Sequence, residues 1–221
     1  MPDRWIDRRA AGVGIVLGLA SLALGVLAAF YDTFPLDERV SAVARDLGPR
    51  FKPIADLAND KNRFIAITVC SLGIVVGALR RQIDVALLFV LSAPARAFLE
   101  VPKDLVDRPR PVGDFPVLDT FGDSSFPSGH VMTATTFFGL WFLLAPWLVP
   151  PRWVQPTRLA VAVVILLYAI SRMWAGVHGL SDTYGSVLWA GTALAVLLAI
   201  RPALQLMLAR ARRLSHAAAE R

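Results

Sequence analysis

Six long runs of apolar residues limit what this chain can fold into more than any other feature. A hydrocarbon core about 30 Å thick requires about 20 apolar residues in a helix. Hydrophobic residues make up 56% of the chain and charged residues only 18%. Buried helices of a soluble bundle would carry polar faces, which these runs lack. We therefore expect an all-α polytopic membrane protein, one domain over residues 1–221, with six spans near residues 11–30, 64–79, 83–101, 130–149, 159–174 and 184–200.

The first run and the single cysteine each have a simple interpretation. The run follows Arg4, Arg8 and Arg9, as the apolar region of a signal peptide would. It is too long for such a region and has no clear cleavage pattern of small residues, so we interpret it as an uncleaved anchor. Cys70 lies inside the second run, where a small buried hydrophobe is the default role. Cysteine therefore predicts neither a disulfide nor a zinc site.

The distribution of basic residues predicts the orientation. A net charge of +6 alone would be compatible with nucleic-acid binding, which we do not expect for a membrane-embedded chain. With six spans, more than half of the 23 basic residues lie on the side of the two termini, and the positive-inside rule makes that side cytoplasmic. A multi-pass protein of the cell (inner or plasma) membrane follows. The basic tail, residues 201–221, either binds anionic lipid or fixes this orientation. The basic residues of the cytoplasmic side are Arg4, Arg8, Arg9, Arg80, Arg81, Arg152, Arg158, Arg201, Arg210, Arg212, Arg213 and Arg221.

The first outer loop, residues 31–63, has apolar residues at steps of three and four, beginning at Val40 and Val43. This spacing is typical of an amphipathic helix at the membrane interface. Such a helix either packs over a site or guides a lipid into it.

Charged residues continue from the third run into the next outer loop. Arg96, Glu100 and Lys103 share one helical face, which Asp107 and Arg110 extend if the helix persists. Charges at membrane depth usually face a bundle interior or a wet cavity. Lys103 and Arg110 would then converge on a phosphate, the arginine as a fork and the lysine as a point charge. Two prolines beyond Lys103 would mark the end of the helix. The alternative is a pair of basic residues that anchor the span end.

A second polar segment precedes the fourth run and reads Pro127-Ser128-Gly129-His130. Ser128 is a good N-cap, and Gly129 lets a ligand approach the backbone. Free N–H groups and the positive end of the helix dipole would face an anion. An ordinary capped helix with an interfacial histidine is the alternative.

A third segment joins the fifth and sixth runs and contains Arg172, His178 and Asp182. Asp182 can accept a hydrogen bond from one nitrogen of His178 and leave the other nitrogen free to attack. Histidine is an established covalent nucleophile. The alternative is an incidental contact in a polar loop.

The three segments together resemble the signature of the type 2 phosphatidic acid phosphatase superfamily. That family includes integral-membrane lipid phosphatases and soluble vanadium haloperoxidases. The motif region covers residues 103–182, and the six-span plan extends the likeness over most of the chain. The matching positions are Lys103, Arg110, Pro111, Pro127, Ser128, Gly129, His130, Ser171, Arg172, His178 and Asp182.

The resemblance implies a role for each site residue. His178 attacks phosphorus to form a phosphohistidine, His130 protonates the leaving oxygen and Asp182 orients His178. The phosphate oxygens are held by Lys103, Arg110, Arg172, Ser128 and the N–H of Gly129. Neither a metal nor another cofactor is implied, because fixed cations stabilise the charge that develops during phosphoryl transfer.

The expected activity is hydrolysis of a lipid phosphate at the outer face of the membrane. Candidate substrates are polyprenyl pyrophosphate such as undecaprenyl pyrophosphate, phosphatidylglycerol phosphate, phosphatidic acid and a lipid A phosphate. Alternatives are a lipid phosphotransferase, a non-enzymatic lipid or anion carrier and, more remotely, a vanadate-dependent peroxidase. The sequence predicts neither the lipid nor the oligomeric state.

Overall fold

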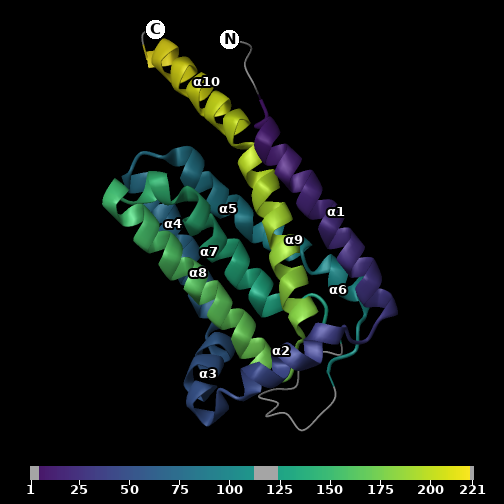
Figure 1. The fold of residues 1–221 in the computed structure, drawn as a ribbon. Helices are drawn as coiled ribbons and strands as arrows, with labels where there is room; N and C mark the ends of the chain where they lie inside the picture. The colour runs from purple at the N-terminus through teal and green to yellow at the C-terminus, as the bar shows by residue number, and fades with distance from the viewer. Residues whose placement is uncertain (1–4, 112–123, 220–221) are drawn as a thin grey trace.

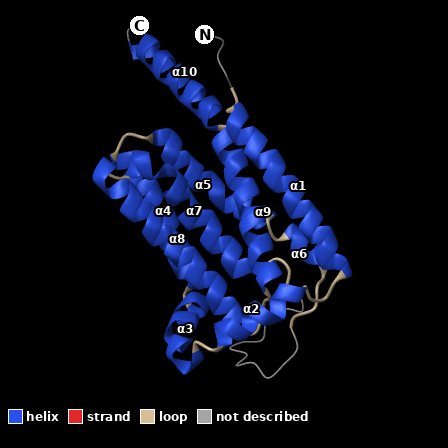
Figure 2. Ribbon diagram, viewed as in Figure 1, coloured by secondary structure: helices blue, strands red, loops and turns tan. Residues whose placement is uncertain are grey.

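The computed structural model describes residues 5–111 and 124–219, and within them the regular elements are all helical (Figures 1 and 2). The elements in chain order are α1 (Arg8–Phe30), α2 (Pro35–Arg45), the 3₁₀ helix η1 (Gly48–Phe51), α3 (Lys52–Asp60), α4 (Asn62–Leu79), α5 (Ile83–Phe98), α6 (Val101–Val106), α7 (Gly129–Leu148), α8 (Pro151–Trp174), α9 (Leu180–Ala199) and α10 (Arg201–Ala219).

Among the described residues, six segments are long and apolar enough to cross a membrane, and each overlaps one of the six predicted spans. Helix α7 is the most buried of them and packs against α4, α5, α8 and α9. Leu88 and Phe89 of α5 meet Leu140 and Leu144 of α7 in the main core. The outward faces of α1, α4 and α8 remain apolar and exposed, as helices that contact hydrocarbon require.

Two helix ends decide questions that the sequence left open. The helix of the third span does not persist to Arg110, because α5 ends at Phe98 and the short α6 ends at Val106. Asp107 follows in the left-handed region with φ 43°, so Asp107 and Arg110 do not share the helical face of Arg96. The predicted loop at residues 150–158 is mostly helix, because α8 begins at Pro151, where a proline at the first helical position costs no hydrogen bond.

The predicted amphipathic loop forms two short helices, α2 and α3, which lie at one end of the bundle (Figure 1). Helix α2 packs against the last turn of α8 and the first turn of α9, and α3 packs against α8. The start of α1 and the whole of α10 lie at the opposite end (Figure 1).

A buried ion pair stabilises that opposite end. Arg201 Nε lies 2.7 Å from Asp84 Oδ2, and its guanidinium stacks 3.9 Å from the ring centroid of Trp147. Gln205 donates to the same carboxylate oxygen at 2.8 Å. Because both charges are almost fully buried, each is stable only in the presence of the other.

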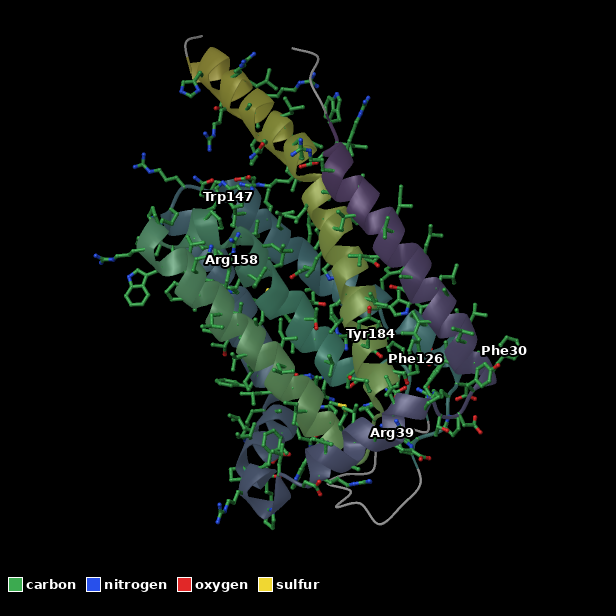
Figure 3. All side chains as sticks on the ribbon, in the orientation of Figure 1. Phe30, Arg39, Phe126, Trp147, Arg158 and Tyr184 are labelled. Atoms are coloured by element: carbon green, nitrogen blue, oxygen red, sulfur yellow. The ribbon has the colours of Figure 1, made fainter. Side chains whose placement is uncertain are left out.

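Helix α9 has no room for a side chain at Gly185. A Cβ there would overlap the ring of Phe126, which is fully buried beside the start of α7 and is labelled in Figure 3. The glycine therefore allows the segment before α7 to lie directly against α9.

We expect Gly185→Ala to lower the free energy of unfolding by about 1–3 kcal/mol, because overpacking forces a shift in a filled interior. Thermal unfolding in detergent measures this change. Gly12→Ala is the control, because a Cβ at Gly12 meets nothing within 4 Å. Equal melting temperatures for both variants would contradict the overlap.

Candidate active site

The three polar segments meet at the end of the bundle that carries α2 and α3. Ser128 N donates to the carbonyl of Asp182 at 3.4 Å, which joins the starts of α7 and α9. Arg110 Nη1 donates to the carbonyl of Val177 at 2.8 Å, which joins the segment after α6 to the loop between α8 and α9. Residues far apart in the sequence thus surround His178.

His178 lies between a carboxylate and a cation. Its Nδ1 is 3.8 Å from Asp182 Oδ2, which is longer than a hydrogen bond, and this nitrogen has no hydrogen-bond partner among the described residues. Its Nε2 lies 3.5 Å from Arg110 Nη1. The predicted His178–Asp182 hydrogen bond is therefore a close approach in this structure, with Nε2 directed to the cationic side.

Burial controls the protonation of His178. The ring is 4% exposed, and this burial lowers the pKa of the imidazole below its ordinary value. Asp182 acts in the opposite direction, while Arg110 and Arg172 lower the pKa further. At neutral pH the imidazole is therefore neutral, with a lone pair on one ring nitrogen.

The carboxylate of Asp182 is held by other groups. Asp182 is the third residue of α9, and its Oδ2 accepts from the N–H of Gly179 at 2.7 Å. Its Oδ1 accepts from Arg108 Nη1 at 2.6 Å. Asp182 is 1% exposed, so its position is fixed by these contacts.

The cations come from two helices, α6 and α8, and from the segment after α6. Lys103 lies on α6, with Arg110 among its electrostatic neighbours. Arg172 is fully buried near the end of α8 and donates to Asn59 Oδ1 at 2.9 Å and to the carbonyl of Ala55 at 3.4 Å. Helix α3 thus holds one of the predicted phosphate-binding side chains.

The start of α7 supplies the remaining groups. Ser128 occupies the N-cap position, but its side chain makes no capping hydrogen bond, contrary to the prediction. Its Oγ is buried without a hydrogen-bond partner among the described residues and can donate to a ligand. His130 has Arg172, His178 and Lys103 as electrostatic neighbours. The first N–H groups of a helix lack partners within it, so an anion would be stabilised here.

Sequence reasoning missed Arg108 and Asp37 as parts of the site, and it placed Arg96 on the inward face without a role there. Arg96 Nη2 donates to the carbonyl of Gly129 at 2.9 Å, and Arg108 binds both Asp182 and Asp37. Arg108 and Arg110 belong to the same Arg-Pro repeat, and this repeat was the only nearby sequence feature that pointed to Arg108. Asp37 gave no signal, because its partners in the site, Arg108 and Ser181, lie 71 and 144 residues away.

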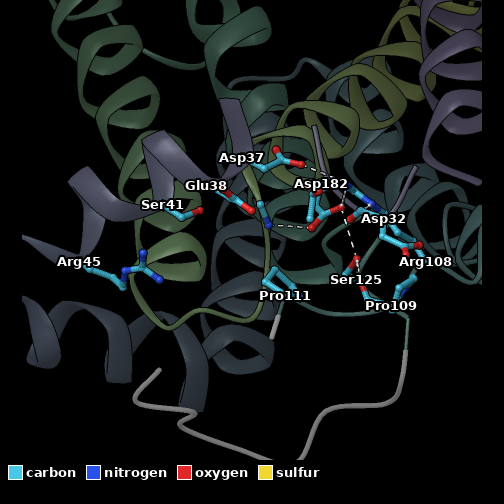
Figure 4. A pocket seen from close by; sticks show the side chains of 12 residues that line it. Asp32, Asp37, Glu38, Ser41, Arg45, Arg108, Pro109, Pro111, Ser125 and Asp182 are labelled. Carbon is cyan, nitrogen blue, oxygen red and sulfur yellow. Dashed lines mark hydrogen bonds and ion pairs between the residues drawn. The ribbon is translucent and has the colours of Figure 1, made fainter. Parts of the chain in front are cut away.

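A cavity of about 460 Å³ borders Asp182 and Arg108 beneath α2 (Figure 4). Asp37 and Ser125 are among its lining residues, whereas His178, His130 and Lys103 are not. The cavity therefore borders the carboxylate of Asp182 but not the predicted catalytic histidines or Lys103.

The comparisons with known proteins concern the fold and the family of the chain. One solved structure with 23% sequence identity has a TM-score of 0.65 and covers 84% of this chain and 94% of its own. It is described as the first transmembrane PAP2 type phosphatidylglycerolphosphate phosphatase from Bacillus subtilis. No curated protein sequence matches the chain. With six apolar helices and this fold, the chain is a multi-pass membrane protein. The model of the PAP2 superfamily matches residues 84–205, which is more than half of the sequence, and the chain belongs to that superfamily.

Proposed function

We propose that this protein is an integral-membrane lipid phosphatase that hydrolyses a phosphate monoester or pyrophosphate of a lipid. The observation that carries the proposal is the buried His178, with Nδ1 toward Asp182 and Nε2 toward Arg110. A nucleophile with an orienting carboxylate on one side and a cation on the other suits attack on phosphorus.

In the first step, the Nε2 lone pair of His178 forms a bond to phosphorus. The bond from phosphorus to the leaving oxygen breaks, and that oxygen takes a proton from His130. Lys103, Arg110 and Arg172 neutralise the non-bridging oxygens, assisted by Ser128 Oγ and the N–H of Gly129. In the second step, water attacks the phosphohistidine, His130 accepts the proton of the water, the N–P bond breaks and inorganic phosphate leaves.

An apolar groove lined in part by α6, the helix that carries Lys103, supports a lipid substrate. The groove has a volume of about 380 Å³ between α1, α6 and α9, and it includes Leu105 and Val106. Phe98 and Leu105 are exposed at its edge, on the face that meets hydrocarbon. A chain in this groove would bring its head group to the cations from the side of the membrane. Polyprenyl pyrophosphate, phosphatidylglycerol phosphate, phosphatidic acid and a lipid A phosphate all fit this description.

The distribution of basic residues supports a protein of the inner or plasma membrane with both termini in the cytoplasm. The site is then extracytoplasmic. The substrate then lies in the outer leaflet, where its phosphate is level with the starts of α7 and α9.

His178→Ala should lower phosphate release from these four lipids by about 10³-fold or more, because the covalent step loses its nucleophile. The measurement is free phosphate in detergent micelles, with acid-labile labelling of the protein as a second readout. His216→Ala is the matched control, since His216 lies on exposed α10 and hydrogen-bonds only within that helix among the described residues. Full activity in His178→Ala would refute the proposed phosphohistidine mechanism. A labelled lipid product in place of free phosphate would identify a phosphotransferase.

The pH dependence of kcat/KM should be bell-shaped, because His178 must be neutral while His130 is protonated. Burial lowers the pKa of His178 below 6.5, so this group stays neutral until the pH falls below that value. The acidic limb, where His178 takes up a proton, should therefore lie below pH 6.5. An acidic limb above pH 6.5 would contradict the assignment.

Phosphate release should persist in EDTA without added metal, because the fixed cations of the site stabilise the transferring phosphoryl group. The assay is initial rate at rising EDTA concentration, with magnesium added back. A rate that falls at least 10-fold with EDTA and recovers with magnesium would show that a metal is required.

A further inference from the structure

One buried guanidinium joins the site to the first outer loop. Arg108 is 2% exposed, and its Nη1 donates to Asp182 Oδ1 at 2.6 Å while its Nη2 donates to Asp37 Oδ2 at 2.9 Å. Its Nε donates to the carbonyls of Tyr31 and Asp32 at 3.1 and 3.0 Å. One arginine therefore binds two carboxylates from different helices, as Figure 4 shows.

Asp37 accepts hydrogen bonds at the starts of two helices, α2 and α9. It is the third residue of α2 and accepts from the N–H of Phe34 at 3.0 Å. It also accepts from the N–H and the hydroxyl of Ser181, both at 2.7 Å, at the start of α9. Gly179 is required at this point, because a Cβ there would lie 2.7 Å from Asp37 Cγ. The amphipathic helix α2 thus caps the helix that carries Asp182.

These contacts leave Asp182 little freedom. Arg108 occupies Oδ1 and the N–H of Gly179 occupies Oδ2, which is also the oxygen that approaches His178. Rotation of the carboxylate would break at least one of these bonds in a buried site, where an unpaired charge is costly.

We propose that the Asp37–Arg108 pair is a positioning device that fixes the orientation and the effective charge of Asp182, and so makes helix α2 part of the catalytic apparatus. The inference rests on the proposed function, in which Asp182 orients the attacking His178. Asp37 lies outside the residues matched by the family model. Neither Asp37 nor Arg108 touches the reacting atoms; both act through Asp182.

The charge arrangement distinguishes this role from simple attachment of α2. Arg108 neutralises part of the charge of Asp182, and Asp37 neutralises part of the charge of Arg108. Removal of Arg108 strengthens the field of Asp182 on His178, whereas removal of the charge of Asp37 weakens it. The two changes therefore act on His178 in opposite directions. Among the described residues, the other charged or titratable groups near His178 are Arg110 before α7, His130 on α7 and Arg172 on α8. Lys103 on α6 is a neighbour of His130 and Arg110, and the cavity beside Asp182 is also lined by Asp32, Glu38 and Arg45.

Three variants test the arrangement: Arg108→Gln, Asp37→Asn and the double variant. In Arg108→Gln, the imidazolium of His178 is stabilised, so its pKa rises and the acidic limb of kcat/KM moves about one unit to higher pH. In Asp37→Asn, the same limb moves to lower pH. The double variant returns toward the wild-type position. Each single variant also lowers kcat by about 10-fold or more with a smaller change in KM, because Asp182 is less well held.

A second readout does not require substrate. The chain has three histidines, so a ¹³C-histidine NMR titration of the full chain in detergent resolves His178 after assignment with His130→Gln and His216→Ala. His178 should titrate higher in Arg108→Gln and lower in Asp37→Asn. If Arg108→Gln does not fold, Arg108→Lys keeps the charge and loses the fork, and should lower kcat without moving the titration.

Asp84→Asn and Arg201→Gln are the matched controls, because they break a buried Asp–Arg pair at the opposite end of the bundle. They should lower the melting temperature and leave both the pH profile and the His178 titration unchanged. Opposite shifts in the two site variants support the inference. Unchanged titration and kcat in Asp37→Asn and Arg108→Gln would overturn it. Wild-type protein that releases no phosphate while His178 still shifts in the variants would instead refute the proposed function.

Discussion

A buried positive charge must be matched within the protein, and Arg108 meets this requirement by binding the helix ends around the site. Its two terminal nitrogens donate to one carboxylate on α2 and one on α9, and its Nε donates to the carbonyls that follow α1. Because a guanidinium donates in several directions at once, one side chain sets the relative positions of three segments. The position of Asp182 beside His178 depends on this arrangement.

The first outer loop, residues 31–63, holds side chains of the site in place and does not only cover them. Helix α2 supplies Asp37 to Arg108, and helix α3 supplies Asn59 and a backbone carbonyl to Arg172. Each of the two short helices therefore holds one arginine of the site. In the proposed function, the contacts of α3 fix Arg172 before a phosphate arrives, and a fixed charge need not reorganise when charge develops during the reaction.

The spans could be predicted from sequence because the hydrocarbon thickness imposes a length on each helix separately. The helix ends could not be predicted equally well. The break after Phe98 and the left-handed Asp107 turn the segment that carries Arg110 away from the helix of Arg96. The starting point of α8 was also hidden, because polar residues at its beginning resemble a loop.

The sequence by itself determined the six apolar helices and the residues of three polar motifs, because hydrophobic length and motif spacing are local properties of the chain. Tertiary structure alone decided that Arg108 binds Asp182 while Arg110 approaches His178, although the two arginines stand in the same Arg-Pro repeat. It also brought Asp37 to Ser181 across 144 residues. The physical reason is that a buried charge pairs with the groups that the packed helices place beside it. The residues next to it in the sequence do not determine that placement.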